Sequence, residues 1–230
     1  MKKIVFIHGA GGCGALWHYQ AKHFPDCDAV TLPGHPGGPP CGSVDEYRQW
    51  LRGHVTGNGF GRVVMTGHSM GGAIALSYAL AHPEDVAGLV LIGTGARLRV
   101  NPAFLKVLAD NIERPPSWYR EIVRPMYGGV DGTVLEGVLD RVCAIPVSAH
   151  LNDFLCCDRF DIMDRIPEIK TPVLLLCGDK DVMTPVKYTR YLADRIPGSR
   201  MVVIPGAGHM VFLEKPDEVN REIEAFVGGL

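Results

Sequence analysis

Residues 67–71 carry the pattern G-x-S-x-G around Ser69. A β-branched run at 62–66 precedes the pattern, and a run rich in helix formers at 72–80 follows it. This context predicts a sharp turn from a buried strand into a helix. Glycines two residues before and after the serine let the backbone pass close by. A serine in such a turn exposes its hydroxyl at a helix N-terminus, where it can act as a nucleophile.

A serine hydroxyl is a weak nucleophile near neutral pH, so it needs a neighbouring base and an acid that orients this base. Two later strand-like runs, 172–177 and 201–204, lead into loops that contain Asp179, Asp181 and His209. The carboxyl ends of parallel strands meet at one edge of a sheet. The loops are therefore expected to bring an acid and a histidine to Ser69, in the chain order serine, acid, histidine.

Taken together, these features resemble the α/β-hydrolase fold, in particular small esterases and lipases, over nearly all 230 residues. The motifs that carry the resemblance are Ile7-His8-Gly9-Ala10-Gly11-Gly12, Gly67-His68-Ser69-Met70-Gly71-Gly72, Gly178-Asp179-Lys180-Asp181 and Gly206-Ala207-Gly208-His209. The resemblance implies a triad of Ser69 as nucleophile, His209 as base and Asp181 as acid. It selects Asp181 over Asp179 because family members usually place the acid three residues after the glycine that ends the strand.

A hydrolase of this kind also needs an oxyanion hole made of backbone N–H groups. One donor is expected to be the residue after the nucleophile, Met70. The His-Gly-x motif in the loop after the first strand points to Ala10 as the other donor, with Gly11 as the alternative. No cofactor and no metal are expected. His8 is expected to support this loop, His68 to be structural, and His35 either to border the cleft or only to turn the chain.

The loop at residues 9–14 also contains G-x-G-x-x-G after the strand-like run 4–7, which is a dinucleotide-binding fingerprint. That fingerprint requires an acid at the end of the second strand, to bind the ribose hydroxyl. The second run, 29–32, ends in Pro33-Gly34-His35-Pro36 instead. An NAD-binding oxidoreductase is therefore only a remote alternative.

Six apolar runs, at 4–7, 29–32, 62–66, 89–92, 172–177 and 201–204, alternate with helical stretches. This alternation predicts an α/β protein with a mostly parallel sheet and helices on both faces. Residues 97–168 interrupt the pattern with short, proline-bounded helices, where the resemblance implies a cap over the active site. One catalytic domain is thus expected in three parts: 1–96 with the oxyanion loop and nucleophile, 97–168 as the helical cap, and 169–230 with the acid and histidine.

The net charge of −2 gives no reason to expect nucleic acid or an anionic membrane as a partner. Apolar runs are far shorter than a membrane span, and the chain enters its first strand without a signal-peptide pattern. Seven cysteines without a metal-binding spacing indicate reduced thiols. A cytoplasmic location is therefore expected, while the oligomeric state stays open.

The most favoured function is hydrolysis of a small-molecule carboxylic ester through an acyl-enzyme. Ala73 stands where relatives that handle anionic substrates often have arginine, so uncharged acyl groups are expected to be preferred. Other members of the fold act as lyases, as lactone or C–C hydrolases, or as ligand receptors with a vestigial triad. A hydroxynitrile-type lyase typically has a lysine near the histidine, but Lys215 lies in what reads as an ordinary helix lead-in.

Overall fold

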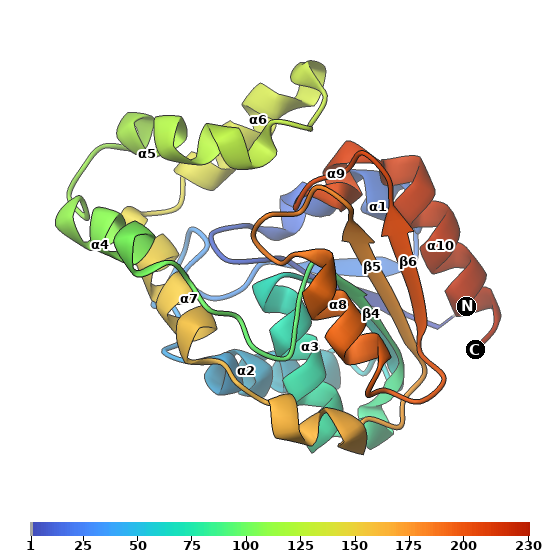
Figure 1. Ribbon diagram of the computed structural model, residues 1–230. Coiled ribbons are helices and arrows are strands. Elements are labelled where there is room, and N and C mark those ends of the chain that lie inside the picture. Colours follow the sequence, from blue (N-terminus) through green and yellow to red (C-terminus); the bar gives the residue numbers. More distant parts are fainter. Residues whose placement is uncertain (1) are drawn as a thin grey trace.

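The computed structural model describes residues 2–230, without the side chain of Pro116. Its centre is one six-stranded sheet with the strand order β2-β1-β3-β4-β5-β6, in which every neighbouring pair is parallel (Figure 1). The strands are β1 (Ile4–Ile7), β2 (Cys27–Val30), β3 (Val63–His68), β4 (Val86–Ile92), β5 (Val173–Gly178) and β6 (Arg200–Ile204). The predicted α/β class with a parallel sheet is confirmed.

Helices cover both faces of the sheet because successive strand side chains point to opposite sides. Val5 and Ile7 of β1 belong to a buried cluster with α2 (Val44–Gly57), α3 (Met70–Ala81) and α8 (Val186–Ala193). Ile4 and Phe6 belong to a second cluster on the other face, which is covered by α1, α9 and α10 (Figure 1). These helices are α1 (His18–His23), α9 (Val211–Glu214) and α10 (Pro216–Gly228), with short 3₁₀ helices at Gly14–Trp17 and Pro83–Asp85.

The second strand ends two residues earlier than predicted, at Val30 instead of residue 32. Its partner β1 is only four residues long, and the pairing runs from Ile4 opposite Cys27 to Ile7 opposite Val30. Beyond that point the Leu32 amide donates to Nε2 of His8 at 3.0 Å and not to a strand carbonyl. Leu32 therefore lies outside the sheet but is still buried, and the apolar pattern of the sequence cannot distinguish this from a strand residue.

A helical insertion lies between β4 and β5, as predicted. It contains α4 (Pro102–Asp110), α5 (Pro116–Val123), α6 (Gly132–Cys143) and α7 (Val147–Arg159). One 3₁₀ helix, Arg124–Tyr127, lies between α5 and α6, and another, Met163–Glu168, follows α7. In Figure 1, α5 and α6 project away from the sheet, whereas α7 returns along the body near α2 and α3. The two ends of the insertion meet, since Arg97 and Asp161 form an antiparallel bridge.

The seven cysteines are all free thiols, and most of them are buried. Within residues 2–230, none of the helices combines the length and apolar character that crossing a membrane requires.

Candidate active site

Ser69 forms the turn between β3 and α3 with a backbone conformation of φ 51° and ψ −117°. In residues 2–230 it is the one non-glycine residue with a positive φ, so the predicted strained turn is present. Both the amide and the carbonyl group of Ser69 form hydrogen bonds. The Ser69 amide donates to the Ile92 carbonyl at 3.0 Å. The Thr94 hydroxyl donates to the Ser69 carbonyl at 2.7 Å.

The glycines on either side of Ser69 are required by close backbone approach. A β-carbon on Gly67 would lie 2.2 Å from the Gly71 carbonyl oxygen, and one on Gly71 would lie 2.2 Å from the Ile7 carbonyl oxygen. No side chain fits at these distances, because the obstacles are backbone atoms that cannot move aside. The turn is therefore pressed against the end of β1, where the first glycine-rich loop begins.

His209 and Asp181 form the hydrogen-bonded pair that the sequence motifs predict. Nδ1 of His209 donates to Oδ2 of Asp181 at 2.8 Å, and both residues are buried. The other carboxylate oxygen, Oδ1, accepts from the amides of Met183 at 2.9 Å and Thr184 at 2.8 Å. The Thr184 hydroxyl also donates to Oδ2 at 2.8 Å.

These four donors decide the charge of Asp181 and the tautomer of His209. Burial alone would raise the pKa of Asp181, but the hydrogen bond and charge of His209, with the Thr184 donors, hold it well below its usual range. An ionised carboxylate can only accept, so the histidine proton lies on Nδ1 and leaves Nε2 free to act as a base. Asp179 has a different partner: its Oδ1 accepts from the Gly206 amide at 2.7 Å.

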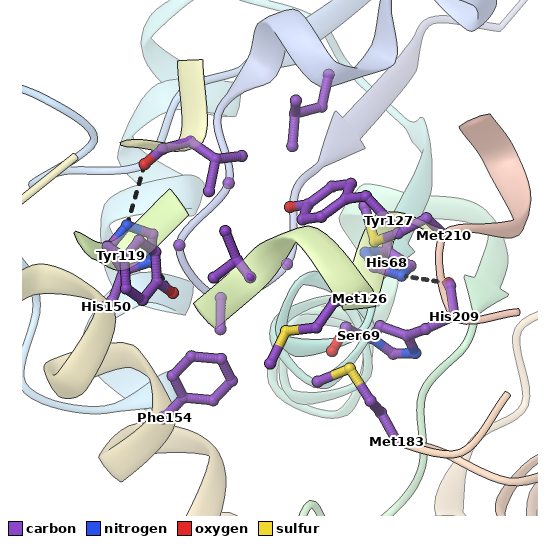
Figure 2. A pocket seen from close by; sticks show the side chains of 17 residues that line it. His68, Ser69, Tyr119, Met126, Tyr127, His150, Phe154, Met183, His209 and Met210 are labelled. Carbon is purple, nitrogen blue, oxygen red and sulfur yellow. Dashed lines mark hydrogen bonds between the residues drawn. The ribbon is translucent and has the colours of Figure 1, made fainter. Parts of the chain in front are cut away.

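The backbone around His209 is fixed by two residues whose roles the sequence did not reveal. Oε2 of Glu214 accepts from the Gly208 amide at 2.7 Å, and Oε1 accepts from the Met210 amide at 3.0 Å. Nε2 of His68 donates to the His209 carbonyl at 3.0 Å (Figure 2). Burial first, and the charge of His209 second, lower the pKa of His68 to about 3, so this side chain is a neutral structural donor. The segment before Pro216 is thus more than a helix lead-in.

Ser69 and His209 line the same small cavity, together with Ala10 of the first loop (Figure 2). Its volume is about 40 Å³. The insertion supplies most of the apolar wall, namely Tyr119, Val123, Met126, Tyr127, Val142 and Phe154. Leu16, Met183 and Met210 supply the rest. Among the described side chains, no lysine or arginine lines this cavity.

Two arginines of the insertion segment point to other partners. Arg97 lies 3.7 Å from Asp161 and lines a separate pocket, and Arg124 donates to Glu136 at 2.7 Å. Neither therefore supplies a positive charge at Ser69.

Backbone N–H groups are available at the two predicted oxyanion positions. Met70 is the first residue of α3, and a helix leaves its first amides without an intrahelical acceptor. Ala10 borders the cavity, and in the described part of the chain no acceptor binds its amide. The alternative donor, Gly11, is already engaged, because its amide donates to Oδ2 of Asp153 at 2.9 Å.

The first glycine-rich loop does not have the structure of a dinucleotide site. A 3₁₀ helix at Gly14–Trp17 follows it, and α1 is only six residues long, whereas the fingerprint needs glycines that open a helix directly. Residues 9–12 line the cavity of Ser69 instead.

A possible metal-binding group is formed by His82, Glu84 and Asp85, whose ligand atoms lie within 4.8 Å of one another. Two arginines occupy the same place: Nη1 of Arg48 lies 2.8 Å from Nε2 of His82, and Arg52 lies 3.5 Å from Asp85. These charges compensate the carboxylates, so the group is an ion-pair network at the surface.

Comparison with known proteins decides the family. The Alpha/beta hydrolase family profile matches residues 4–222. The chain belongs to this family. A solved structure described as a thermophilic esterase is 33% identical, has a TM-score of 0.84, and is matched over 100% of this chain and 90% of its own.

Two curated relatives cover most of both chains at lower identity. A pimeloyl-[acyl-carrier protein] methyl ester esterase of Aeromonas hydrophila is 26% identical over 241 residues, which cover 98% of this chain and 95% of the relative. A 2-hydroxy-6-oxo-6-phenylhexa-2,4-dienoate hydrolase of Comamonas testosteroni is 28% identical over 244 residues, covering 95% and 85%. These relatives are hydrolases of different substrates, so the family alone does not define a substrate.

Proposed function

We propose that the protein is a carboxylic ester hydrolase that works through an acyl-enzyme at Ser69. The observation that carries this proposal is that the residues needed for such a reaction lie around one cavity. A strained serine and a histidine bound to a buried carboxylate line the same cavity, beside two backbone amides at the oxyanion positions. Esterases among the relatives and structural neighbours support the same reaction class.

In the first half-reaction, Nε2 of His209 takes the proton of the Ser69 hydroxyl as its oxygen attacks the ester carbonyl. The Met70 and Ala10 amides stabilise the negative oxygen of the tetrahedral intermediate. His209 then donates its proton to the leaving alcohol. Asp181 stabilises the charged imidazole throughout, since its carboxylate stays ionised.

In the second half-reaction, water takes the place of the alcohol, and His209 removes a proton from it as it attacks the acyl-enzyme. The same amides stabilise the second intermediate, and the proton returns from His209 to the Ser69 oxygen as the acid leaves. No cofactor takes part in either half.

The apolar wall of the cavity favours the binding of an uncharged acyl group of modest size. Most of its aromatic, aliphatic and thioether side chains come from the insertion. Each buried methylene of the substrate contributes roughly 0.8 kcal/mol. A carboxylate buried against these groups would lose its hydration without gaining a partner. Lyase chemistry of the hydroxynitrile kind has no support, because Lys215 lines neither cavity that His209 borders.

The test combines turnover with covalent labelling. The purified protein is assayed with p-nitrophenyl butyrate, then treated with a serine-directed phosphonate and analysed by intact mass and peptide mapping. We expect the protein to hydrolyse the ester. One equivalent of the phosphonate should inactivate it completely, and the label should be found on Ser69. Ser77→Ala, which changes another serine of α3, serves as the control and should be labelled like the parent. Absence of turnover, or a label on another residue, would contradict the proposal.

A further inference from the structure

Asp153 is a fully buried carboxylate of α7 that the reaction above does not use, with an exposed fraction of 0%. Three donors from three other segments converge on it. Oδ2 accepts from the Gly11 amide at 2.9 Å and from Nε2 of His35 at 2.6 Å. Oδ1 accepts from the Tyr47 hydroxyl at 2.8 Å. The side chain therefore joins the insertion to the oxyanion loop, to the loop after β2 and to α2.

The geometry makes the partner His35 a cation. Its Nε2 faces the Asp153 carboxylate, and its Nδ1 faces two carbonyl oxygens, of Leu32 at 3.1 Å and Pro33 at 3.0 Å. Both ring nitrogens therefore meet acceptors, which requires a proton on each. Burial alone would lower the pKa of His35, but the bond to Asp153 raises it above its usual value. Burial would likewise raise the pKa of Asp153, but the bond to His35 lowers it.

A second residue of α7 contacts the same loop. His150, one helical turn before Asp153, leaves no space beside Gly11, where a β-carbon would lie 1.9 Å from Nδ1 of His150. The His150 ring is fixed at both nitrogens, by the Tyr119 hydroxyl at 2.9 Å and the Val142 carbonyl at 3.1 Å (Figure 2). Gly11 itself has a φ of 63°. The loop is thus held in one conformation by the insertion.

We propose that Asp153 is a positioning residue of the oxyanion hole, and this inference rests on the proposed ester hydrolysis. By accepting the Gly11 amide, the carboxylate fixes the peptide between Ala10 and Gly11 and removes Gly11 as a donor to the substrate. The Ala10 amide is then the donor that this loop presents to the cavity. Asp153 acts through Ala10 and does not touch the substrate.

The test compares Asp153→Asn with Tyr47→Phe. An asparagine has the same shape but no charge and only one oxygen. Gly11 and His35 both bind Oδ2, so they lose this acceptor together if the amide nitrogen takes its place, and both bonds weaken with the lost charge if the oxygen stays there. Tyr47→Phe removes a hydrogen bond to the same carboxylate but leaves the Gly11 contact in place. For p-nitrophenyl butyrate we expect Asp153→Asn to lower kcat about 10- to 100-fold with KM changed less than about threefold. Tyr47→Phe should keep kcat within about threefold of the parent.

A second readout separates positioning from general loss of structure. A boronic acid that forms a tetrahedral adduct with Ser69 should bind Asp153→Asn more weakly, by about the factor lost in kcat. A ketone analogue of the substrate that cannot hydrate should bind the variant and the parent equally well. If Asp153→Asn does not give the circular dichroism spectrum of the parent, His35→Gln replaces it, and a kcat loss of at least about fivefold is expected.

The outcomes distinguish this inference from the proposed function. A parent protein without ester turnover contradicts the proposed function. An active parent with an equally active Asp153→Asn, or equally active His35→Gln, overturns only the role of Asp153. Equal losses of kcat in Asp153→Asn and Tyr47→Phe would overturn it too, because the carboxylate would then act through packing alone.

Discussion

At the scale of single residues, two aspartates of one loop have different surroundings although they are only two positions apart. Asp181 is buried and binds His209, while Asp179 binds the Gly206 amide. We expect Asp181→Asn to lower kcat by about 10³- to 10⁴-fold, because an amide group facing Nδ1 favours the wrong histidine tautomer. Asp179→Asn should have little effect, since an asparagine oxygen still accepts from Gly206.

The comparison is made by steady-state kinetics with one ester, after thermal melts show that both variants are folded. A larger loss in Asp179→Asn than in Asp181→Asn would move the acid to Asp179 and contradict the site described above.

The sequence predicted which side chains would meet at the candidate site, but it did not predict the residues that hold them in place. Ser69, Asp181 and His209 each stand in a local pattern of glycines after a strand. The pairing of His35 with Asp153 joins residues 118 positions apart and has no such pattern, because it depends on how α7 packs against the loop after β2. Glu214 also gives no signal, since its bonds go to backbone amides that any sequence offers.

At the scale of secondary-structure elements, we expect the insertion to determine which acyl groups enter the cavity. Its helices contribute most of the apolar wall, and Arg97 and Arg124 bind carboxylates elsewhere. We therefore expect kcat/KM to be at least about tenfold higher for a butyryl ester than for the hemisuccinyl ester of the same alcohol, because the second carboxylate would be buried without a partner. Parallel assays of the two p-nitrophenyl esters measure this ratio. A preference for the hemisuccinyl ester would refute it and point to a dicarboxylic substrate.

The order and type of the core elements could be predicted because buried parallel strands are short apolar runs between helices. Two features limited this reasoning. The second strand ends where its four-residue partner ends, which is a property of β1 and not of its own sequence. The residues of the insertion that face the cavity could not be separated from those that pack its helices together, because both sets are apolar at helical spacing.

At the scale of the whole molecule, three buried neutral histidines make stability depend on pH. Burial is the main cause that lowers the pKa of His8 to about 4, of His68 to about 3 and of His150 to about 4. In the unfolded chain each has a pKa near 6.5. Below that value the unfolded chain takes up protons that the folded protein does not, so unfolding is favoured as pH falls from about 6.5 toward 4.

We expect the free energy of unfolding to fall below pH 6.5, with an uptake of roughly three protons near pH 5. His35 does not oppose this change, because its raised pKa leaves it charged in both states at that pH. Above pH 6.5 the raised pKa of His35 acts in the opposite direction, because its stabilising contribution is lost as the pH rises through that pKa. Urea denaturation at pH 7.5, 6 and 5 measures the effect. In His150→Gln the uptake should decrease by about one proton, and a pH-independent stability of the parent would contradict the expectation.

The central claim is that the Ser69 hydroxyl is the nucleophile of ester hydrolysis, and its most direct test is the turnover of p-nitrophenyl butyrate by Ser69→Ala. The hydroxyl group lies at a turn that backbone bonds and glycine contacts hold in place, so the variant should keep the fold and circular dichroism spectrum of the parent. We predict a loss of kcat of about 10⁴-fold or more. A folded Ser69→Ala that retains more than about one-hundredth of the parent activity would contradict this mechanism.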